Sequence, residues 1–431
     1  MVVARTLTPL RSAEILAVGS ELLTPFRTDT NSLFITSRLN DLGVEVIAKS
    51  VVADHAGTLQ AALRLALSRA DIVVTSGGLG PTDDDLTRDA IAAVAGRDQV
   101  EQPSVVAAIE ARFASRGWKM PENNRRQAMV PAGADTLDNP NGTAPGLWLS
   151  HEGRVIIALP GPPREMTPMW DTHVAPQLAT LTGSGMLRRR IIRIAGRGES
   201  HVDQVAAPIY RSWTSAPVPI ATTILASPGQ VELHLSAHGE DRAALDQVLG
   251  EAVGELTTAL GSAVYSTDGR DLEQVVADRL LALGATVAAA ESCTGGLLMG
   301  RLTSVPGSSR WLTGGIVAYS NSVKVNDLGV ADSTLTDHGA VSEPVAVAMA
   351  RGVRRRMRAT FGIGITGIAG PDGGTAAKPV GTVVICVCGP GDDDVVVKTA
   401  KLPGERAMVR RLSVQTALDM LRRACGSPDY N

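Results

Sequence analysis

The sequence is poor in cysteine and in aromatic residues. It holds four cysteines among its 431 residues, and Phe, Trp and Tyr together make up 3% of the chain. Cys386 and Cys388 stand two residues apart in an apolar run and would share one face of a strand, but no second Cys or His pair follows at zinc-binding spacing. We therefore expect the cysteines to be small buried side chains in a reducing cytosol, and the cores to consist of Val, Leu, Ile and Ala.

Positive charge is not in surplus, and long apolar runs are missing. The formal net charge is -3, which argues against a dedicated nucleic-acid-binding protein. Residues 1–12 lack the apolar segment of a signal peptide, and no apolar run is long enough to cross a bilayer. The sequence thus predicts a cytoplasmic protein without membrane contact. It still allows anionic small molecules as ligands, because glycine-rich loops bind phosphate without net basicity.

Glycine, in contrast, is abundant, with 44 residues that indicate tight turns or ligand-facing loops. The length suggests about three domains. Strands alternate with helices over 13–177, which predicts an α/β domain with a parallel sheet and ligands at the carboxyl ends of its strands. The order βαββα over 187–265 predicts a small α+β domain. Residues 271–424 predict a second α/β domain that ends in a helix.

The last domain contains the motif AESCTGG, residues 290–296, between a predicted strand and a predicted helix. Ser292, Cys293 and Thr294 are three candidate nucleophiles. The two glycines let a ligand approach the backbone, and amides at a helix start can stabilise a phosphate or an oxyanion. The alternative is an ordinary N-cap, which is the more frequent role of Ser or Thr before a helix.

Two further segments of this domain could contribute to a site. Lys324 ends the motif YSNSVK, and a lysine can act as general base for a serine when burial lowers its pKa. The alternative is a solvated helix residue. A predicted strand also ends in the glycine-rich segment GITGIAGPDGG, residues 364–374, which would be either a loop against a ligand or a flexible surface hairpin.

Five motifs of the last domain, in this order, carry a family resemblance: AESCTGG, PGSSRWLTGGIVAYSNSVK, HGAVSEPVA, GIGITGIAGPDGG and KPVGTV. They closely resemble the C-terminal domain of the CinA family over residues 271–424. That domain is homologous to stand-alone nicotinamide mononucleotide amidohydrolases. The resemblance implies that nicotinamide mononucleotide and water give nicotinic acid mononucleotide and ammonia, with no cofactor in this domain.

The resemblance also implies roles for single residues. Ser292 would attack the carboxamide carbon, Lys324 would take the serine proton, and amides near residues 294–296 would hold the oxyanion. Tyr319 and Thr366 would support catalysis or contact substrate. Ser308, Ser309 and Cys293 stay open as rival nucleophiles, since a thiolate is intrinsically reactive. The substrate-binding candidates are Glu291, Thr294, Gly295, Gly296, Ser309 and Gly370.

The first domain has its own ligand-facing motifs, in which glycines can expose amides to phosphate. The binding candidates are Gly19, Glu21, Asp29, Asn31, Gly77, Gly78, Gly80, Thr82 and Arg125. We expect Asp84 and Asp85 to hold a hard divalent ion that bridges a pyrophosphate. The alternative, an acidic first turn of a capped helix, is equally good for the neighbouring Asp83.

These motifs again resemble CinA, whose first domain is related to molybdopterin-binding proteins. The resemblance implies a metal-dependent ADP-ribose pyrophosphatase that releases AMP and ribose 5-phosphate, with NAD-type dinucleotides as further candidate substrates. Arg125, Arg126 and Arg164 would contact phosphates, or lie on the surface. The middle domain resembles the KH-like linker of the family but lacks the GxxG loop of RNA binders.

Pyridine and adenine nucleotides are therefore the expected small-molecule partners, and the family resemblance implies a homodimer. The combined role would lie in pyridine nucleotide salvage. An alternative is a non-catalytic pterin- or nucleotide-binding protein in competence or cofactor pathways. The presence of both Ser292 and Lys324 argues against a degenerate enzyme.

Overall fold

A computed structural model of the chain describes residues 9–183, 185–391 and 393–426. We expected residues 1–12 to lack a signal peptide, and residues 1–8 of this segment lie outside the described part. The contacts divide the chain into two compact units. The first holds residues up to 188 together with 237–246, and the second holds 189–236 together with the residues from 247 onward. Across the described residues, none of the helices combines the length and the apolar character needed to span a membrane.

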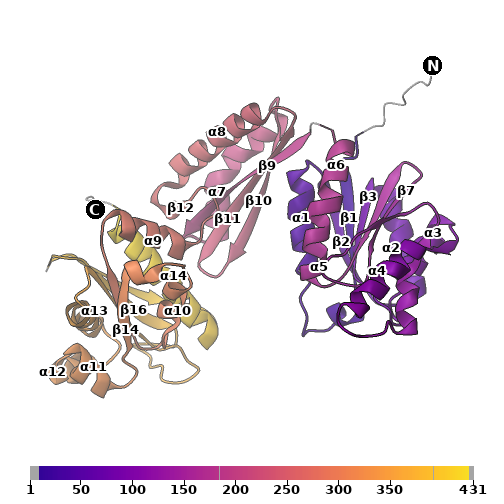
Figure 1. The fold of residues 1–431 in the computed structure, drawn as a ribbon. Helices are drawn as coiled ribbons and strands as arrows, with labels where there is room; N and C mark the ends of the chain where they lie inside the picture. The colour runs from indigo at the N-terminus through magenta and orange to yellow at the C-terminus, as the bar shows by residue number, and fades with distance from the viewer. Residues whose placement is uncertain (1–8, 184, 392, 427–431) are drawn as a thin grey trace. The chain divides into compact units, whose positions relative to one another are not determined.

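The first unit contains a six-stranded sheet with strand order β2-β1-β3-β8-β7-β6 (Figure 1). Its strands are β1 (Ser12–Val18), β2 (Glu45–Val52), β3 (Ile72–Ser76), β6 (Asp135–Leu137), β7 (Gly146–His151) and β8 (Arg154–Leu159). Of these six strands, β7 is antiparallel to both of its neighbours, β8 and β6, and the other five run in one direction. The expected parallel sheet is thus a mixed one, because a tight turn joins β7 directly to β8 without a crossover helix.

Helices cover both faces of this sheet, since successive strand residues point to opposite sides. Leu16 of β1 packs with α2 and α3, whereas its neighbour Ile15 packs with α1, α5 and α6. A separate two-stranded ribbon joins β4 (Gln99–Glu101) to β5 (Met129–Pro131). The helices and helical turns are η1 (Ser20–Leu23), α1 (Asn31–Asp41), α2 (Ala56–Arg69), α3 (Thr87–Ala95), α4 (Pro103–Ala114), η2 (Glu122–Ala128), α5 (Pro163–Met169), η3 (Trp170–Val174) and α6 (Ala175–Leu181).

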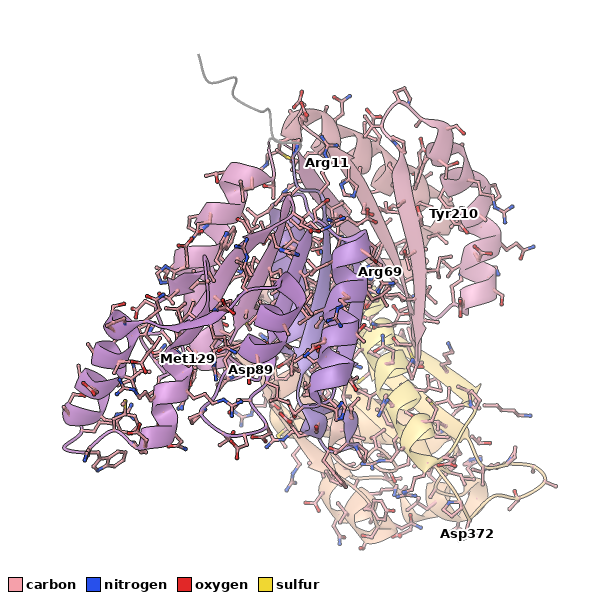
Figure 2. The ribbon with its side chains drawn as sticks, turned by 90° about the vertical axis from the view of Figure 1, so that its right-hand side faces the viewer. Arg11, Arg69, Asp89, Met129, Tyr210 and Asp372 are labelled. Carbon is pink, nitrogen blue, oxygen red and sulfur yellow. The ribbon has the colours of Figure 1, made fainter. Side chains whose placement is uncertain are left out.

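One charge lies inside the apolar run of β1. Glu14 is buried there, and its carboxylate accepts two hydrogen bonds of 2.7 Å from the guanidinium of Arg69. Figure 2 labels Arg69, which is the last residue of α2. A buried carboxylate needs such a partner, because leaving it unpaired in an apolar core would be costly.

The middle of the chain forms a four-stranded sheet with order β10-β11-β9-β12. Its strands are β9 (Met186–Ala195), β10 (Ile220–Ser227), β11 (Gln230–Gly239) and β12 (Val264–Ser266). The helices and turns are α7 (Glu199–Tyr210), η4 (Arg211–Ser215), α8 (Arg242–Leu260) and η5 (Gly261–Ala263). The elements follow the predicted order βαββα, and β12 adds a short last strand against β9.

The last domain contains a five-stranded sheet with order β14-β13-β15-β16-β17. Its strands are β13 (Val287–Glu291), β14 (Leu312–Val317), β15 (Phe361–Gly367), β16 (Thr382–Cys388) and β17 (Val395–Lys401). The first three are parallel to one another, β16 pairs antiparallel with β15, and β17 pairs antiparallel with β16. Cys386 and Cys388 are unpaired thiols buried on β16, which confirms their interpretation as core residues.

Two helical layers enclose this sheet (Figure 1). Helices α9, α10 and α14 share one core with the first face, and α11, α12 and α13 pack on the other. The elements are α9 (Leu272–Ala282), α10 (Leu297–Thr303), η6 (Ser308–Arg310), α11 (Asn321–Leu328), α12 (Asp332–His338), α13 (Glu343–Met357) and α14 (Arg406–Ala424). The carboxyl ends of β13, β14 and β15 therefore meet at one edge, where ligands bind in open α/β sheets.

Candidate functional site

The turn Ser292–Gly296 lies at the carboxyl end of β13, between the ends of β14 and β15. The Ser292 amide donates to the Ile365 carbonyl at 2.9 Å, and the Ala318 amide donates to the Glu291 carbonyl at 2.8 Å. The parallel register therefore brings together the candidate nucleophile, the segment that follows β14 and the end of β15. Three of the sequence motifs meet here, although up to about 70 residues separate them along the chain.

Glu291 has a different role from the substrate contact that we expected. Its carboxylate is fully buried and accepts hydrogen bonds from the amides of Gly296, Leu298 and Met299 at 2.9–3.1 Å. The Gly295 amide is also used, because it donates to the Ser292 carbonyl at 3.1 Å. An anion of the protein itself thus occupies the positive end of α10.

Of the amides of residues 294–296 that we expected to hold an oxyanion, those of Gly295 and Gly296 are therefore already used within the turn. Within the described chain, the amides of Cys293 and Thr294 donate to no other backbone or side-chain group. The Thr294 hydroxyl is buried and likewise has no partner among the described residues. In the described part of the chain, these are the donors of the turn that no other protein group uses.

Replacing Glu291 by alanine should destabilise the last domain. Three backbone amides, of which that of Leu298 is buried, would each lose a charge-assisted hydrogen bond, and an orphaned buried donor costs on the order of 1–3 kcal/mol. We expect the free energy of unfolding to fall by at least about 2 kcal/mol, measured by urea denaturation with Trp311 fluorescence in a background whose other tryptophans are replaced by phenylalanine. Glu343→Ala is the control, because Glu343 is exposed at the start of α13 and accepts only from the Thr399 hydroxyl. Equal losses in both variants would contradict the assigned role of Glu291.

Lys324 is buried rather than solvated, with 2% of its surface exposed. Its Nζ donates to the carbonyls of Ala318 at 2.9 Å and Tyr319 at 3.3 Å. Burial lowers the pKa of Lys324, although the neighbouring Cys293 thiol acts in the opposite direction. A neutral amine has two N–H groups and one lone pair, so two carbonyl acceptors leave the lone pair free to receive a proton.

Ser292 and Lys324 are held around the same backbone contact. The residue before Ser292 accepts from the Ala318 amide, and the Ala318 carbonyl accepts from Lys324. Among the described residues, no hydrogen bond joins the serine hydroxyl to the lysine amine directly. Catalytic hydrogen bonds are often loose before substrate binds, so this arrangement is compatible with a nucleophile and its base.

The rival nucleophiles are less suited to this site. Burial raises the pKa of the Cys293 thiol to about 11, which keeps it protonated at neutral pH and weakly nucleophilic. Ser308 and Ser309 lie on η6, immediately before β14 begins. Because β14 is parallel to β13, they lie at the opposite edge of the sheet, on the order of 15–20 Å from Ser292. Within one chain, Ser309 is not brought to the site that we expected it to line.

Two arginines that the sequence analysis did not single out reach the site from α14. Arg406 donates to the Gly370 carbonyl at 2.9 Å and to the Tyr319 hydroxyl at 3.2 Å. Arg410 donates to the Thr294 carbonyl at 2.7 Å, and its Nε is buried without a partner in the described chain. Their spacing of four residues on one helix was the available signal. They place positive charge beside the candidate nucleophile.

The other predicted residues of this site differ in accessibility. The Thr366 hydroxyl is buried and donates to the Ala340 carbonyl at 2.8 Å, so it joins the end of β15 to the loop before α13. Tyr319 is 63% exposed and is held at its hydroxyl by Arg406. Tyr319 can therefore contact a ligand, whereas Thr366 supports the loop.

The first domain has a second candidate site, a cavity of about 370 Å³ at the carboxyl ends of β1 and β3. It brings together seven predicted residues, namely Gly19, Glu21, Gly77, Gly78, Gly80, Asp84 and Asp85. Gly77 must be glycine here, because its φ is +109° and a Cβ would lie 2.2 Å from the Val18 carbonyl oxygen. The absence of a side chain therefore lets this loop pack directly against the end of β1.

Asp85 is used by the loop itself and is not a free metal ligand. One carboxylate oxygen accepts from the Gly80 amide at 2.7 Å, and the other accepts from the Thr82 amide at 2.8 Å and from the Thr82 hydroxyl. In the described residues, no three His, Cys, Asp or Glu side chains are close enough to form a metal site by themselves.

Arg88 supports this loop and was missed by the sequence analysis. It is buried, and it donates to the carbonyls of Leu79 and Gly80 at 2.5 and 2.9 Å. Burial lowers the pKa of Arg88 to about 10. Its position as the second residue of α3 does not distinguish it from a surface arginine.

Four predicted residues lie outside the lining of the cavity. Asn31 donates to the Ser76 hydroxyl and to the Gly161 carbonyl, and Asp29 accepts from the Ser32 amide at the start of α1. Both therefore hold the backbone around the cavity. Thr82 has a similar role, because its amide and its hydroxyl donate to Asp85. Arg125 forms a two-pronged pair with Glu101, and Arg126 pairs with Asp89, so neither guanidinium is a free phosphate ligand.

Acidic side chains dominate this cavity. Its lining contains Glu21, Asp54, Asp84, Asp85 and Glu165, and it includes no lysine or arginine among the described residues. Glu165 is largely buried and accepts from the Asn139 amide at 2.9 Å. A polyphosphate would be repelled by these carboxylates unless a cation came with it. The oxygen donors fit a hard divalent ion that uses one or two carboxylates and takes its other ligands from phosphate and water.

Comparisons with known proteins agree with this organisation. The profile of the CinA C-terminal domain matches residues 269–425, that of a probable molybdopterin binding domain matches 14–180, and that of the damage-inducible protein CinA KH domain matches 189–266. A "CinA-like protein" of Koribacter versatilis is 46% identical over 415 residues, which cover 95% of this chain and 99% of that protein. A "putative competence-damage inducible protein" of Symbiobacterium thermophilum is 43% identical, with 95% and 98% coverage.

Among solved structures, the competence/damage inducible protein CihA from Agrobacterium tumefaciens is 41% identical. The match covers 37% of this chain and 98% of that one, with a TM-score of 0.34. The fold and the matched profiles define a protein in which a molybdopterin-binding-like domain, a KH-like domain and an α/β domain follow one another. The chain belongs to the CinA family.

Proposed function

We propose that the last domain hydrolyses the carboxamide of nicotinamide mononucleotide to nicotinic acid mononucleotide and ammonia. The observation that carries this proposal is the buried Lys324 amine, whose N–H groups are used by two carbonyls beside the Ser292 turn. Such an amine, once neutral, can accept a serine proton without a histidine, and the burial that lowers the pKa of Lys324 favours its neutral form. The lysine thus makes an amidase more plausible than a binding protein alone.

The reaction would follow from these groups in two halves. Ser292 Oγ attacks the carboxamide carbon while Lys324 takes its proton, and the amides of Cys293 and Thr294 hold the resulting oxyanion. Lys324 then returns the proton to the departing nitrogen, so that the C–N bond breaks and ammonia leaves an acyl-serine ester. A water molecule then gives a proton to Lys324 and attacks the ester carbon. The bond to Ser292 Oγ breaks, Lys324 returns the proton to this oxygen, and the acid product leaves and ionises to the carboxylate.

The arginines of α14 would select the mononucleotide. Arg410 has a buried, unpartnered Nε next to Thr294, and Arg406 joins Tyr319 to the loop of Gly370. Guanidinium groups suit phosphate oxygens, and the exposed Tyr319 ring can lie against a pyridine. Incubating the protein with nicotinamide mononucleotide and measuring ammonia tests the proposal. Nucleotide binding without any ammonia release would favour the non-catalytic alternative.

For the first domain we propose a metal-dependent pyrophosphatase that acts on ADP-ribose. The acidic cavity supports this, because a pyrophosphate bound among carboxylates needs an accompanying divalent cation. Asp84 and Glu165 would hold that cation, which would neutralise phosphate charge during hydrolysis. Loop amides from Gly77 to Gly80 would contact the phosphate oxygens.

Removing divalent metal should separate the two activities. We expect chelation to abolish AMP release from ADP-ribose, since the carboxylates would then repel the substrate, and to leave ammonia release from nicotinamide mononucleotide within about twofold. Chromatography of both reactions in one incubation measures this. Metal-independent AMP release would contradict the proposal.

A matched pair of aspartates sharpens the test. Asp84→Asn should lower AMP release at least about 10²-fold, as expected for loss of a metal-holding carboxylate. Asp83→Asn is the control, because Asp83 is fully exposed, lies outside the cavity lining and pairs only with Arg126.

A further inference from the structure

The KH-like sheet and the last domain share one continuous core. Ala195 of β9 and Tyr265 of β12 are buried in the same apolar cluster as α9, α10 and α14. Only residues 267–271 separate the end of β12 from the start of α9. Both belong to the second compact unit. The middle sheet is therefore fastened to the helical layer that carries the amidase turn.

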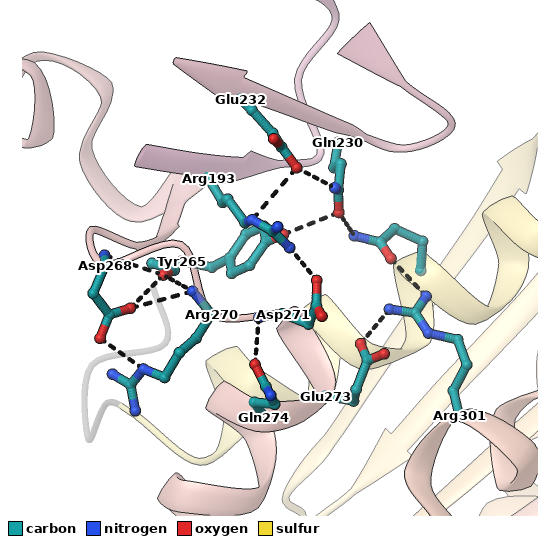
Figure 3. Close-up of polar contacts among 12 residues, drawn as sticks. Arg193, Gln230, Glu232, Tyr265, Asp268, Arg270, Asp271, Glu273, Gln274 and Arg301 are labelled. Carbon is teal, nitrogen blue, oxygen red and sulfur yellow. Dashed lines mark hydrogen bonds and ion pairs between the residues drawn. The ribbon is translucent and has the colours of Figure 1, made fainter. Parts of the chain in front are cut away.

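Polar contacts reinforce this junction, as Figure 3 shows. Arg193 of β9 pairs with Asp271, the residue that caps α9, and its Nε lies 3.4 Å from a Glu232 carboxylate oxygen on β11. At the other end of the junction, Arg422 of α14 donates to the Ser262 carbonyl at 2.7 Å. The Arg193 and Glu232 side chains are 16% and 18% exposed, which favours one geometry for this pair, whereas Asp271 is 55% exposed.

A chain of contacting side chains continues from this junction to α10, the helix that follows the Ser292 turn (Figure 3). Arg301 of α10 pairs with Glu273 of α9 and donates to Gln415 of α14 at 2.7 Å. The side-chain Nε2 of Gln415 lies 3.5 Å from the side-chain Oε1 of Gln230 on β11. The same Oε1 accepts a hydrogen bond from the Tyr265 hydroxyl at 2.9 Å. We call Arg301, Gln415, Gln230 and Tyr265 the brace.

The brace acts on a helix that needs support. Helix α10 has seven residues, and helices of this length are not stable by themselves in water. Glu291 holds its first turn and Arg301 holds its last turn. Helix α14 has the brace residue Gln415 near its middle and the site residue Arg410 towards its start. A shift at either helix would thus move the amidase turn.

We propose that the KH-like domain positions the amidase turn through this brace, with Arg301 as a positioning residue for Ser292. This inference rests on the amidase function proposed for the last domain. It assigns to the middle domain a role in catalysis that needs no nucleic acid. Displacements of about 1 Å caused by changes far from the chemistry can lower a rate about 10²-fold, so the brace should affect turnover more than binding.

Hydrogen exchange of the full chain tests the brace without any activity assay. In Arg301→Met, the amides of residues 292–303 should exchange at least about tenfold faster than in the wild type. Gln230→Ala, at the other end of the brace, should accelerate the same segment. Arg270→Met is the matched control, because Arg270 pairs with Asp268 and Asp278 and, among the described residues, has no hydrogen bond or ion pair to a brace residue. Unchanged exchange in both brace variants, or an equal change in the control, would overturn the inference.

Kinetics of the same variants give the second readout. We expect Arg301→Met to lower kcat about 10–100-fold while KM stays within about threefold. The double variant Arg301→Met/Gln230→Ala should lose less than the product of the two single losses, because both changes break one connection. A loss in the double variant equal to the product of the two single losses would contradict the proposed connection. If the wild type released no ammonia, the proposed function would fail, whereas hydrogen exchange would still decide whether the brace orders the turn.

Discussion

Ser292→Ala should abolish ammonia release from nicotinamide mononucleotide while the fold stays intact. The hydroxyl is the group that would form the acyl-enzyme, and removing the nucleophile of a serine hydrolase costs on the order of 10⁴–10⁶ in kcat. Ammonia measured by a coupled assay, beside circular dichroism and thermal unfolding of both proteins, gives the comparison. We expect the loss to be at least about 10³-fold.

Variants at two rival nucleophiles serve as controls for this result. Ser309→Ala should keep full activity, because η6 lies at the opposite edge of the sheet. Cys293→Ala should remain active, since burial keeps the thiol protonated, although the turn carries an oxyanion donor at this position. Mass spectrometry of the quenched wild-type reaction should find the acyl group on Ser292. Normal activity in Ser292→Ala would transfer the nucleophile to another residue.

Lys324→Met should lower kcat/KM by at least about 10²-fold, which is the usual contribution of a general base. Methionine is of similar length and stays apolar in the buried position, so the packing loss is small. Substrate binding should change little, because Lys324 would transfer a proton and would contact no part of the nucleotide. A rate close to that of the wild type would refute its assignment as base.

The pH dependence follows from the direction of the lysine shift. A base must be neutral, so wild-type kcat/KM should rise with pH as Lys324 loses its proton. Burial lowers the pKa of Lys324, and the rise should therefore lie below the ordinary lysine value of about 10.4. The residual activity of Lys324→Met should lack this limb. A wild-type profile that stays flat up to the titration range of free lysine would contradict the proposal.

The same shift predicts a stability difference. The unfolded chain binds a proton at Lys324 that the folded chain has released, between the lowered pKa and about 10.4. The free energy of unfolding should consequently rise with pH in that window. Lys324→Met removes this contribution, so its slope with pH should be smaller, as urea denaturation at several pH values can measure.

The sequence analysis was most successful where a motif follows a strand. The end of β13 is predicted by its apolar run and by the glycines after it, and the parallel register then brings Ser292, Tyr319 and Thr366 to one edge. It was less successful with carboxylates. Glu291 and Asp85 look like ligand-facing acids in the motifs, but each accepts backbone amides of its own loop.

The arginines show the same limit. Arg406 and Arg410 lie more than 100 residues after the nucleophile, and no local pattern connects their helix with the turn. Arg125 stands in a family motif, yet its guanidinium is paired with Glu101. Whether a charged side chain is free or paired depends on the segment packed against it, which spacing along the chain does not encode.

Family membership and the order of the domains follow from the amino-acid sequence alone, which also names Ser292 and Lys324 as the candidate nucleophile and base. They depend on residue types at short spacing, which local chemistry interprets well. Only the tertiary structure decided which carboxylates are already used, which arginines reach the nucleophile and that Lys324 is buried. These properties arise when distant segments pack together, because removing water and supplying hydrogen-bond partners sets the charge and the availability of each group.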